Sequence, residues 1–187
     1  MTPTRNRSSS SRYSDPGAAP LQPTHRGPAL TITVEADFGP DTEGVLVAHG
    51  GQESGYLLYV QDGMLRYEQN WFGEMLRLDP IPVPSGPATV TIRVELPEPG
   101  TWLVGLEIDG KRMAQDAFPQ FTGLMPFAGI DVDMDRRSPV SWELYTDKGP
   151  YPYSGRITKV TYTPGMRTTE ALAELIEQAK ELGLALE

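Results

Sequence analysis

Residues 44–70 read GVLVAHGGQESGYLLYVQDGMLRYEQN and carry the strongest indication of fold class in this chain. We expect two short apolar strands before a glycine-rich turn, a third strand after the turn, and a fourth after Asp62-Gly63. An Asp-Gly pair between the apolar runs 56–60 and 64–67 is typical of a tight β-hairpin, because such turns require residues that tolerate positive φ. The segment therefore predicts antiparallel β structure.

Segments on both sides of this one alternate between apolar and polar residues, as half-buried strands do. In Leu30–Phe38 the even-numbered residues are apolar and the odd-numbered ones are polar. A second hairpin of the same design turns at Asp109-Gly110. Further strands are expected at 75–78, 89–96, 102–108, 111–117, 129–135 and 155–162. Many short strands separated by turn residues predict an all-β fold, an antiparallel two-sheet, jelly-roll-like sandwich.

The chain divides into three expected regions. Residues 1–28 are rich in Ser, Pro and Gly and are expected to be a flexible tail or linker, because they bury too little apolar surface to offset the entropy of ordering. Residues 29–164 are expected to form the sandwich. Residues 165–187 predict one C-terminal amphipathic helix, which either packs on the sandwich or docks on a partner. Its apolar residues recur at helical spacing: Leu172, Leu175, Ile176, Ala179 and Leu182.

The bulk composition excludes several classes of function. The chain has 187 residues, a net charge of −9 and no cysteine. The acidic balance argues against nucleic acid and membrane partners, because binding phosphate requires clusters of Lys and Arg. The absence of cysteine excludes a thiol nucleophile, a disulfide and a zinc–thiolate site. Residues 1–14 are polar and basic and lack the apolar stretch of a signal peptide, so the chain as written is expected in the cytoplasm.

Few residues are candidates for catalysis. His25 and His49 are the two histidines, and neither has a second histidine at metal-ligand spacing. His49 is interpreted as a residue of the glycine-rich turn. Glu43, Glu68 and Glu107 are interpreted as carboxylates on a solvated sheet face. We therefore expect no catalytic and no cofactor-binding residue.

Three aspartates are candidate metal ligands. Asp131, Asp133 and Asp135 alternate along an expected strand, so they would share one face at a spacing of about 7 Å per step. Ca²⁺ is one way to neutralise these like charges, and neighbouring Arg136 and Arg137 are another. The alternative interpretation is that all three are ordinary surface carboxylates at the end of a sheet.

Aromatic residues in or near loops are candidate ligand-stacking groups. Lectin-like sandwiches use exposed aromatic rings to stack on sugars, and the same ring types also fill the ends of sandwiches. The residues singled out are Trp71, Trp142 and Tyr151. They predict a glycan site if their rings are exposed.

Several segments together resemble a known family. The run ALTITVEADFGPDTEGVLVAHGGQESGYLLYVQDGMLRYEQNWFG and the later LEIDGKRMAQ, GIDVDMDRRSPVSWEL and SGRITKVTYTPG are similar, in the same order, to the C-terminal region of large bacterial arylsulfatases. The similar region runs from about Arg12 to Pro164. The resemblance implies a concanavalin- or laminin-G-like sandwich appended to a sulfatase catalytic core.

The resemblance implies no catalytic residue in this chain. The family's core uses a formylglycine made from the Cys or Ser of a C/S-x-P-x-R motif, together with Ca²⁺. Residues 85–87, Ser-Gly-Pro, are not that motif, because the required arginine is missing. We therefore expect a chain that is inactive by itself: an accessory domain that packs on, or assists, a sulfatase core and uses its C-terminal helix as a contact surface. The alternative is a carbohydrate-binding, lectin-like module.

Overall fold

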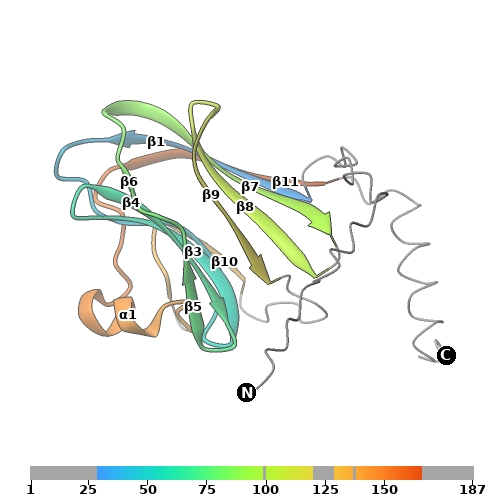
Figure 1. Ribbon diagram of the computed structural model, residues 1–187. Helices are drawn as coiled ribbons and strands as arrows, with labels where there is room; N and C mark the ends of the chain where they lie inside the picture. Colours follow the sequence, from blue (N-terminus) through green and yellow to red (C-terminus); the bar gives the residue numbers. More distant parts are fainter. Residues whose placement is uncertain (1–28, 99, 120–128, 137, 166–187) are drawn as a thin grey trace, which may run out of the picture.

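The structure is a two-layer antiparallel sandwich (Figure 1). The computed structural model describes residues 29–98, 100–119, 129–136 and 138–165. Sheet A contains, in spatial order, β11 (Arg156–Pro164), β1 (Leu30–Phe38), β7 (Gly86–Glu98), β8 (Thr101–Ile108) and β9 (Lys111–Pro119). Sheet B contains β10 (Ile130–Val132), β2 (Gly44–Gly50), β3 (Ser54–Gln61), β4 (Met64–Trp71) and β5 (Glu74–Arg77), with β6 (Ile81–Pro82) paired to β4. The expected fold class is confirmed.

The main core lies between the two sheets. In β1 the even-numbered positions from Ile32 to Phe38 are buried, as the alternation predicts. Strands β7, β8, β3 and β4 direct their own apolar faces into the same layer. Burying one large aliphatic or aromatic side chain contributes about 1.5–3 kcal/mol, so this layer is the main source of stability. Its largest fully buried members include Tyr67, Ile32, Leu58, Leu65, Ile92 and Leu106.

Both predicted Asp-Gly hairpins are present. The φ angles are 54° and 70° at Asp62 and Gly63, and 49° and 79° at Asp109 and Gly110. Positive φ at both central residues is the type I′ geometry that matches the twist of the flanking strands. The first hairpin joins β3 to β4 and the second joins β8 to β9, each without a residue inserted at the turn.

The beginning of the segment 44–70 differs from the sequence expectation. One strand, β2, replaces the two expected ones, and its register against β3 shifts between Val45 and Val47. Because of this bulge, Leu46 and Val47 both belong to the core between the sheets, whereas Val45 and Ala48 pack on the opposite face of sheet B. The break in alternation made one bulged strand look like two.

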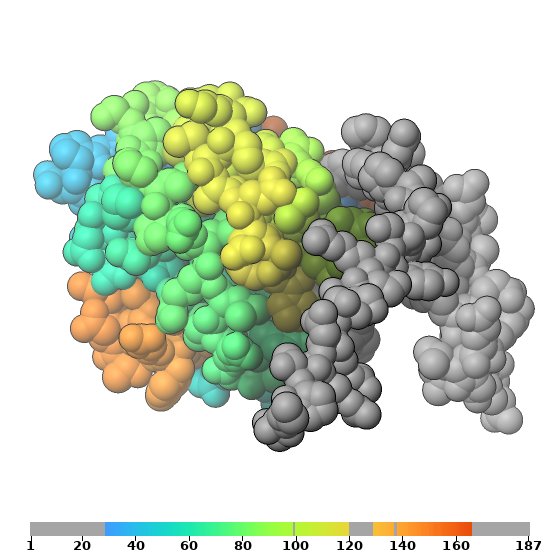
Figure 2. Space-filling model, in the orientation of Figure 1, coloured from blue at the N-terminus to red at the C-terminus, as the bar shows by residue number. Residues whose placement is uncertain are grey.

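One helix, α1 (Trp142–Lys148), lies where the sequence analysis expected only loop. Its N-cap is Ser141, whose hydroxyl accepts a hydrogen bond from the backbone N–H of Leu144. The segment around α1 covers the face of sheet B that points away from sheet A, which we call the outer face. Figure 2 shows the orange atoms of this segment directly against sheet B. A second apolar cluster lies there: Val45, Ala48, Leu57, Tyr59, Val140, Tyr151 and Leu144.

The expected strand at 129–135 is shorter than predicted. Only Ile130–Val132 pairs with β2. Asp133 has a φ of 76°, a left-handed conformation that ends the strand. The prediction that Asp131, Asp133 and Asp135 share one strand face is therefore wrong.

Two expected regions lie outside the described residues. These are the N-terminal tail, residues 1–28, and the C-terminal helix, of which residues 166–187 are not described. Within the part of the chain that is described, no helix has the length and apolar character needed to cross a membrane.

Candidate binding site between α1 and sheet B

The outer face of β4 and β5 forms the floor of the candidate site. Strand alternation places Glu68 and Asn70 on this face. The register pairs Glu68 with Arg77 and Asn70 with Met75. Two neighbouring pockets lie between these cross-strand pairs and α1, and Glu143 lines both. We call them the polar pocket and the tryptophan pocket.

The polar pocket has a volume of about 330 Å³ and is lined mainly by charged and hydroxyl side chains. Its sheet side contains Tyr59, Arg66, Glu68 and Arg77. Its helix side contains Glu143, Leu144 and Asp147. The pocket therefore has two guanidinium groups and three carboxylates within one small volume.

Glu68 is the central residue of the polar pocket and is only 6% exposed. Its Oε1 accepts hydrogen bonds from the Tyr59 hydroxyl at 2.8 Å and from Arg77 Nε at 3.0 Å. Its Oε2 is buried and has no hydrogen-bond partner among the described residues, and the same is true of Arg66 Nε. A buried polar atom without a partner costs about 1–3 kcal/mol. Both atoms belong to residues that line the polar pocket, although the atoms themselves are shielded from solvent.

Arg77 connects the sheet to the helix. Its Nε donates to Glu68, and its Nη2 lies 3.2 Å from Glu143 Oε2 on α1. The hydrogen bond to Glu68 raises the pKa of Arg77 above its ordinary value, although burial opposes this, so the guanidinium is charged at all working pH values. Burial, followed by the nearby charge of Glu68, raises the pKa of Tyr59, so its hydroxyl remains a donor.

The tryptophan pocket has a volume of about 520 Å³ and a more apolar wall. Met75, Val140 and Trp142 line it together with the polar residues Gln52 and Asn70. Trp142 is 61% exposed and stacks on Tyr145, with ring centroids 5.9 Å apart and planes 19° from parallel. One indole face is therefore supported by the helix while much of the ring remains open to solvent.

Asn70 fixes the walls of the tryptophan pocket. Its buried amide nitrogen donates to the carbonyl oxygens of Gln52 at 2.8 Å and Val140 at 2.9 Å. Its Oδ1 accepts from the backbone N–H of Gly73 at 2.8 Å. One side chain of β4 thereby joins three separate loops, and it pairs the buried carbonyl oxygen of Val140.

Asp135 fixes the beginning of α1. Its Oδ2 accepts from the backbone N–H of Val140 at 2.8 Å, and the backbone of Ser141 also donates to this carboxylate. Burial raises the pKa of Asp135 to about 6, which the two backbone hydrogen bonds oppose and the charge of Asp131 reinforces. Because Ser141 is the N-cap, this buried carboxylate positions Trp142, the first residue of the helix.

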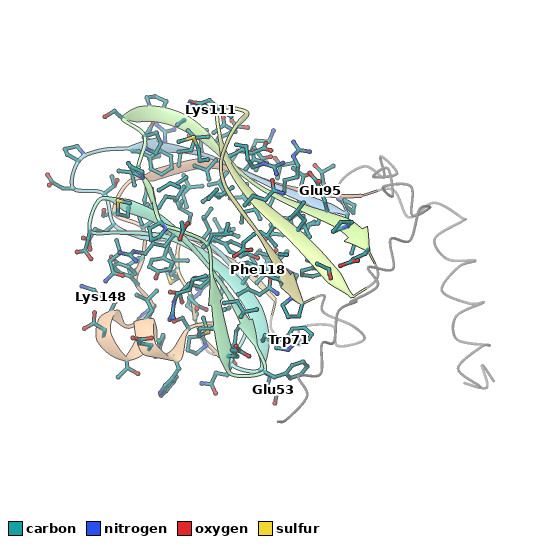
Figure 3. All side chains as sticks on the ribbon, viewed as in Figure 1. Glu53, Trp71, Glu95, Lys111, Phe118 and Lys148 are labelled. Carbon is teal, nitrogen blue, oxygen red and sulfur yellow. The ribbon has the colours of Figure 1, made fainter. Side chains whose placement is uncertain are left out.

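The three aromatic residues predicted to stack on a ligand do not lie together. Trp142 lines the tryptophan pocket. Trp71 ends β4 and makes an edge-to-face contact with Phe72 at 5.1 Å, near Glu53 at one end of sheet B (Figure 3). Tyr151 is 8% exposed, and its hydroxyl donates to Glu43 Oε2 at 2.7 Å, so its ring belongs to the second apolar cluster and offers no face to a ligand.

Two of the three aspartates, Asp131 and Asp135, bond to protein groups through their side chains. Asp131 accepts from the backbone N–H of Arg136 at 3.1 Å and pairs with its guanidinium at 3.3 Å. Asp135 is engaged with the start of α1, and Arg137 lies outside the described residues. Within residues 29–98, 100–119, 129–136 and 138–165, no group of three or more His, Asp or Glu side chains could hold a metal ion. Ca²⁺ binding remains a prediction from the sequence only.

Two other interpretations from the sequence are corrected. Glu68 and Glu107 do not lie on a solvated face, because both are buried under arginine side chains. His49 is a residue of β2 rather than of the turn, and its Nδ1 lies 3.1 Å from the Tyr56 hydroxyl. Burial lowers the pKa of His49, so the ring is neutral near pH 7. His25 lies outside the described residues.

Comparisons with known proteins give little beyond the architecture. No family model and no curated protein matches the sequence. Among the solved structures that match is sheep galectin-11 in complex with glycerol, at 15% sequence identity and a TM-score of 0.43. The alignment covers 72% of this chain and 88% of the galectin chain. We therefore base the function on the residues of the two pockets.

Proposed function

We propose that this chain is a carbohydrate-binding, lectin-like β-sandwich whose site consists of the polar pocket and the tryptophan pocket. The observation that carries the proposal is that two residues lining the polar pocket each have a buried atom with no hydrogen-bond partner in the described part of the chain, Glu68 Oε2 and Arg66 Nε. Rotation of the two side chains toward the pocket would expose these atoms to a ligand. A hydroxyl group both donates and accepts hydrogen bonds, so sugar hydroxyls are suited to satisfy both. A buried carboxylate and guanidinium would make charge-assisted hydrogen bonds, which are the stronger class.

Trp142 supplies the apolar half of such a site. Sugar rings have C–H faces as well as hydroxyl edges, and binding sites combine an apolar wall with a few placed polar groups. The exposed indole of Trp142 lies beside Met75 and Val140 and is held by its stack on Tyr145. This arrangement is suited to a ring that stacks through one face.

The charge of the polar pocket favours a neutral sugar. Its three carboxylates, Glu68, Glu143 and Asp147, outnumber its guanidinium groups, which are already bonded in part to carboxylates. A sulfated or carboxylated sugar would meet like charges there, which costs affinity. We therefore expect neutral glycans to bind and sulfated ones to bind less well.

Glycan-array binding followed by isothermal titration calorimetry tests this function. The wild-type chain is expected to bind at least one neutral glycan, and Glu68→Gln and Trp142→Ala are each expected to weaken binding about tenfold or more. Glu107→Gln is the matched control, because Glu107 is an equally buried outer-face carboxylate on sheet A with both oxygens bonded to Arg93. Circular dichroism is used to check that each variant is folded.

Two results would refute the proposal. One is the absence of binding to any glycan on the array. The other is binding that Glu68→Gln and Trp142→Ala leave unchanged, since the site would then lie elsewhere on the molecule.

An accessory role beside a sulfatase core is the second proposal. Its support is the resemblance of several segments to arylsulfatase C-terminal regions, including GIDVDMDRRSPVSWEL, which runs from β10 into α1. Size-exclusion chromatography of this chain with a sulfatase core that lacks its own C-terminal domain tests it. Co-elution is the expected result, and separate elution at micromolar concentrations would contradict it. The chain alone is expected to hydrolyse no aryl sulfate.

A further inference from the structure

The two pockets lie in line along β4 and β5. Glu68 pairs with Arg77 across these strands, and both residues line the polar pocket. The next outward-facing pair, Asn70 and Met75, lines the tryptophan pocket. Two residues along a strand span about 7 Å, so the two cross-strand pairs that line the pockets are offset by a distance comparable to one sugar unit.

Glu143 marks the junction of the two pockets. It lines both of them, and its side chain is 84% exposed, so it forms part of their common rim. The residues on either side of it in α1 line different pockets: Trp142 lines the tryptophan pocket and Leu144 lines the polar pocket. The two pockets therefore adjoin each other beside α1.

The two pockets offer different contacts to a ligand: charged hydrogen-bonding groups in the polar pocket and an aromatic ring in the tryptophan pocket. The unsatisfied atoms, Glu68 Oε2 and Arg66 Nε, belong to residues of the polar pocket. The exposed aromatic ring belongs to Trp142 in the other pocket. A sugar ring bound in the polar pocket leaves the exposed indole in the adjoining pocket available to a second ring.

We propose that the polar and tryptophan pockets form one elongated site that binds a neutral oligosaccharide of at least two units, with its chain running along β4 and β5 past Glu143. One unit is held by hydrogen bonds to Glu68 and Arg66, and the next stacks on Trp142. This inference rests on the proposed carbohydrate-binding function and adds the length and direction of the ligand.

Chain-length dependence of binding tests the inference. The probes are mono- to hexasaccharides of β-1,4- and β-1,3-linked glucose, galactose, mannose and xylose, first as an array and then by calorimetry for the series that binds. Affinity is expected to rise at least tenfold from the monosaccharide to the di- or trisaccharide and then to level off. Glu68→Gln is expected to weaken every length, whereas Trp142→Ala removes the gain from the second unit and changes monosaccharide affinity less than about twofold.

Phe72→Ala is the matched control for Trp142→Ala. Phe72 is a similarly exposed aromatic residue near the site but outside the lining of both pockets, so its removal is expected to leave the length dependence intact. Equal affinity for monosaccharide and hexasaccharide would overturn the inference and leave the proposed function standing. So would a Trp142→Ala variant that weakens all lengths equally. Absence of binding at every length would refute the proposed function itself.

Discussion

At the scale of single residues, the two carboxylate oxygens of Glu68 have different roles, one in the structure and one in the candidate site. Oε1 accepts hydrogen bonds from Tyr59 and Arg77, whereas Oε2 has no hydrogen-bond partner among the residues that the structure describes. Glu68→Ala removes the shared acceptor and leaves two donors without it, so the free energy of unfolding is expected to fall by about 1–3 kcal/mol. Glu68→Gln keeps one acceptor oxygen and is expected to cost less. Urea denaturation of both variants measures this, and equal losses would contradict the division of roles.

Gly44 is required at the start of β2, where the backbone of Pro152 approaches closely. It has a φ of 113°, and a Cβ atom there would lie 2.3 Å from the carbonyl oxygen of Pro152. Gly44→Ala is therefore expected to destabilise the fold by on the order of 2–4 kcal/mol. Gly39→Ala is the control, because its Cβ would make an ordinary 3.6 Å contact with Thr42. Chemical denaturation that gives similar losses for both would contradict the close approach.

The same scale explains why the site was not visible in the sequence. Arg66, Glu68 and Arg77 look like ordinary charges of a solvated strand, and only the register of β4 against β5 brings Glu68 and Arg77 together. Trp142 was recognised as a stacking candidate from its residue type. Its pocket could not be predicted, because Asn70 and Asp135 fix the walls through contacts distant in sequence.

At the scale of elements, local sequence determines the hairpins but not α1. The alternation of β1 and the Asp-Gly turns were sufficient to predict those strands, because period and turn chemistry act over a few residues. Helix α1 has only seven residues and no buried residue of its own, so it has no apolar period to detect. The end of β10 at Asp133 was likewise invisible, because a left-handed aspartate leaves the alternation of letters unchanged.

Asp135 makes the attachment of α1 sensitive to pH. Its pKa in the folded chain is about 6, above the ordinary value of 3.8, so the folded state holds its proton more tightly than the unfolded state. Its contribution to stability is therefore fully present below pH 3.8 and is lost as pH rises through about 6. As pH rises over this range, the free energy of unfolding of the wild type is expected to fall relative to that of Asp135→Asn. Calorimetric unfolding from pH 4 to 7 measures it, and a difference that favours wild type increasingly as pH rises would contradict the assignment.

At the scale of the whole molecule, each sheet has one buried glutamate on the side that points away from the other sheet, and the two glutamates have different hydrogen-bond partners. On sheet A, Glu107 Oε1 accepts from Arg93 and Arg112, and its Oε2 accepts from Arg93. On sheet B, Glu68 Oε2 has no hydrogen-bond partner in the described part of the chain, and Glu68 lines a pocket beside α1. The same residue type is therefore part of a closed structural network on one face and of an open site on the other.

This contrast predicts that substitution of Glu107 lowers stability without weakening glycan binding, whereas substitution of Glu68 weakens both. Burial tends to raise the pKa of Glu107, but the hydrogen bonds from Arg93 and Arg112 outweigh it, and the pKa lies below its ordinary value. A depressed pKa gives stability that is present at neutral pH and is lost as pH falls through the lowered pKa. Glu107→Gln is thus expected to lower the melting temperature at pH 7, to do so less at acidic pH, and to leave glycan binding unchanged. A loss of binding would place the site on sheet A.

The central claim is that a neutral glycan binds between α1 and the outer face of β4 and β5. A titration of the ¹⁵N-labelled chain with the best array ligand, followed by backbone amide NMR, tests it most directly. The account predicts the largest chemical-shift changes in β4, β5 and the start of α1, together with the indole N–H of Trp142. Changes centred on β7, β8 and β9 of sheet A would contradict it.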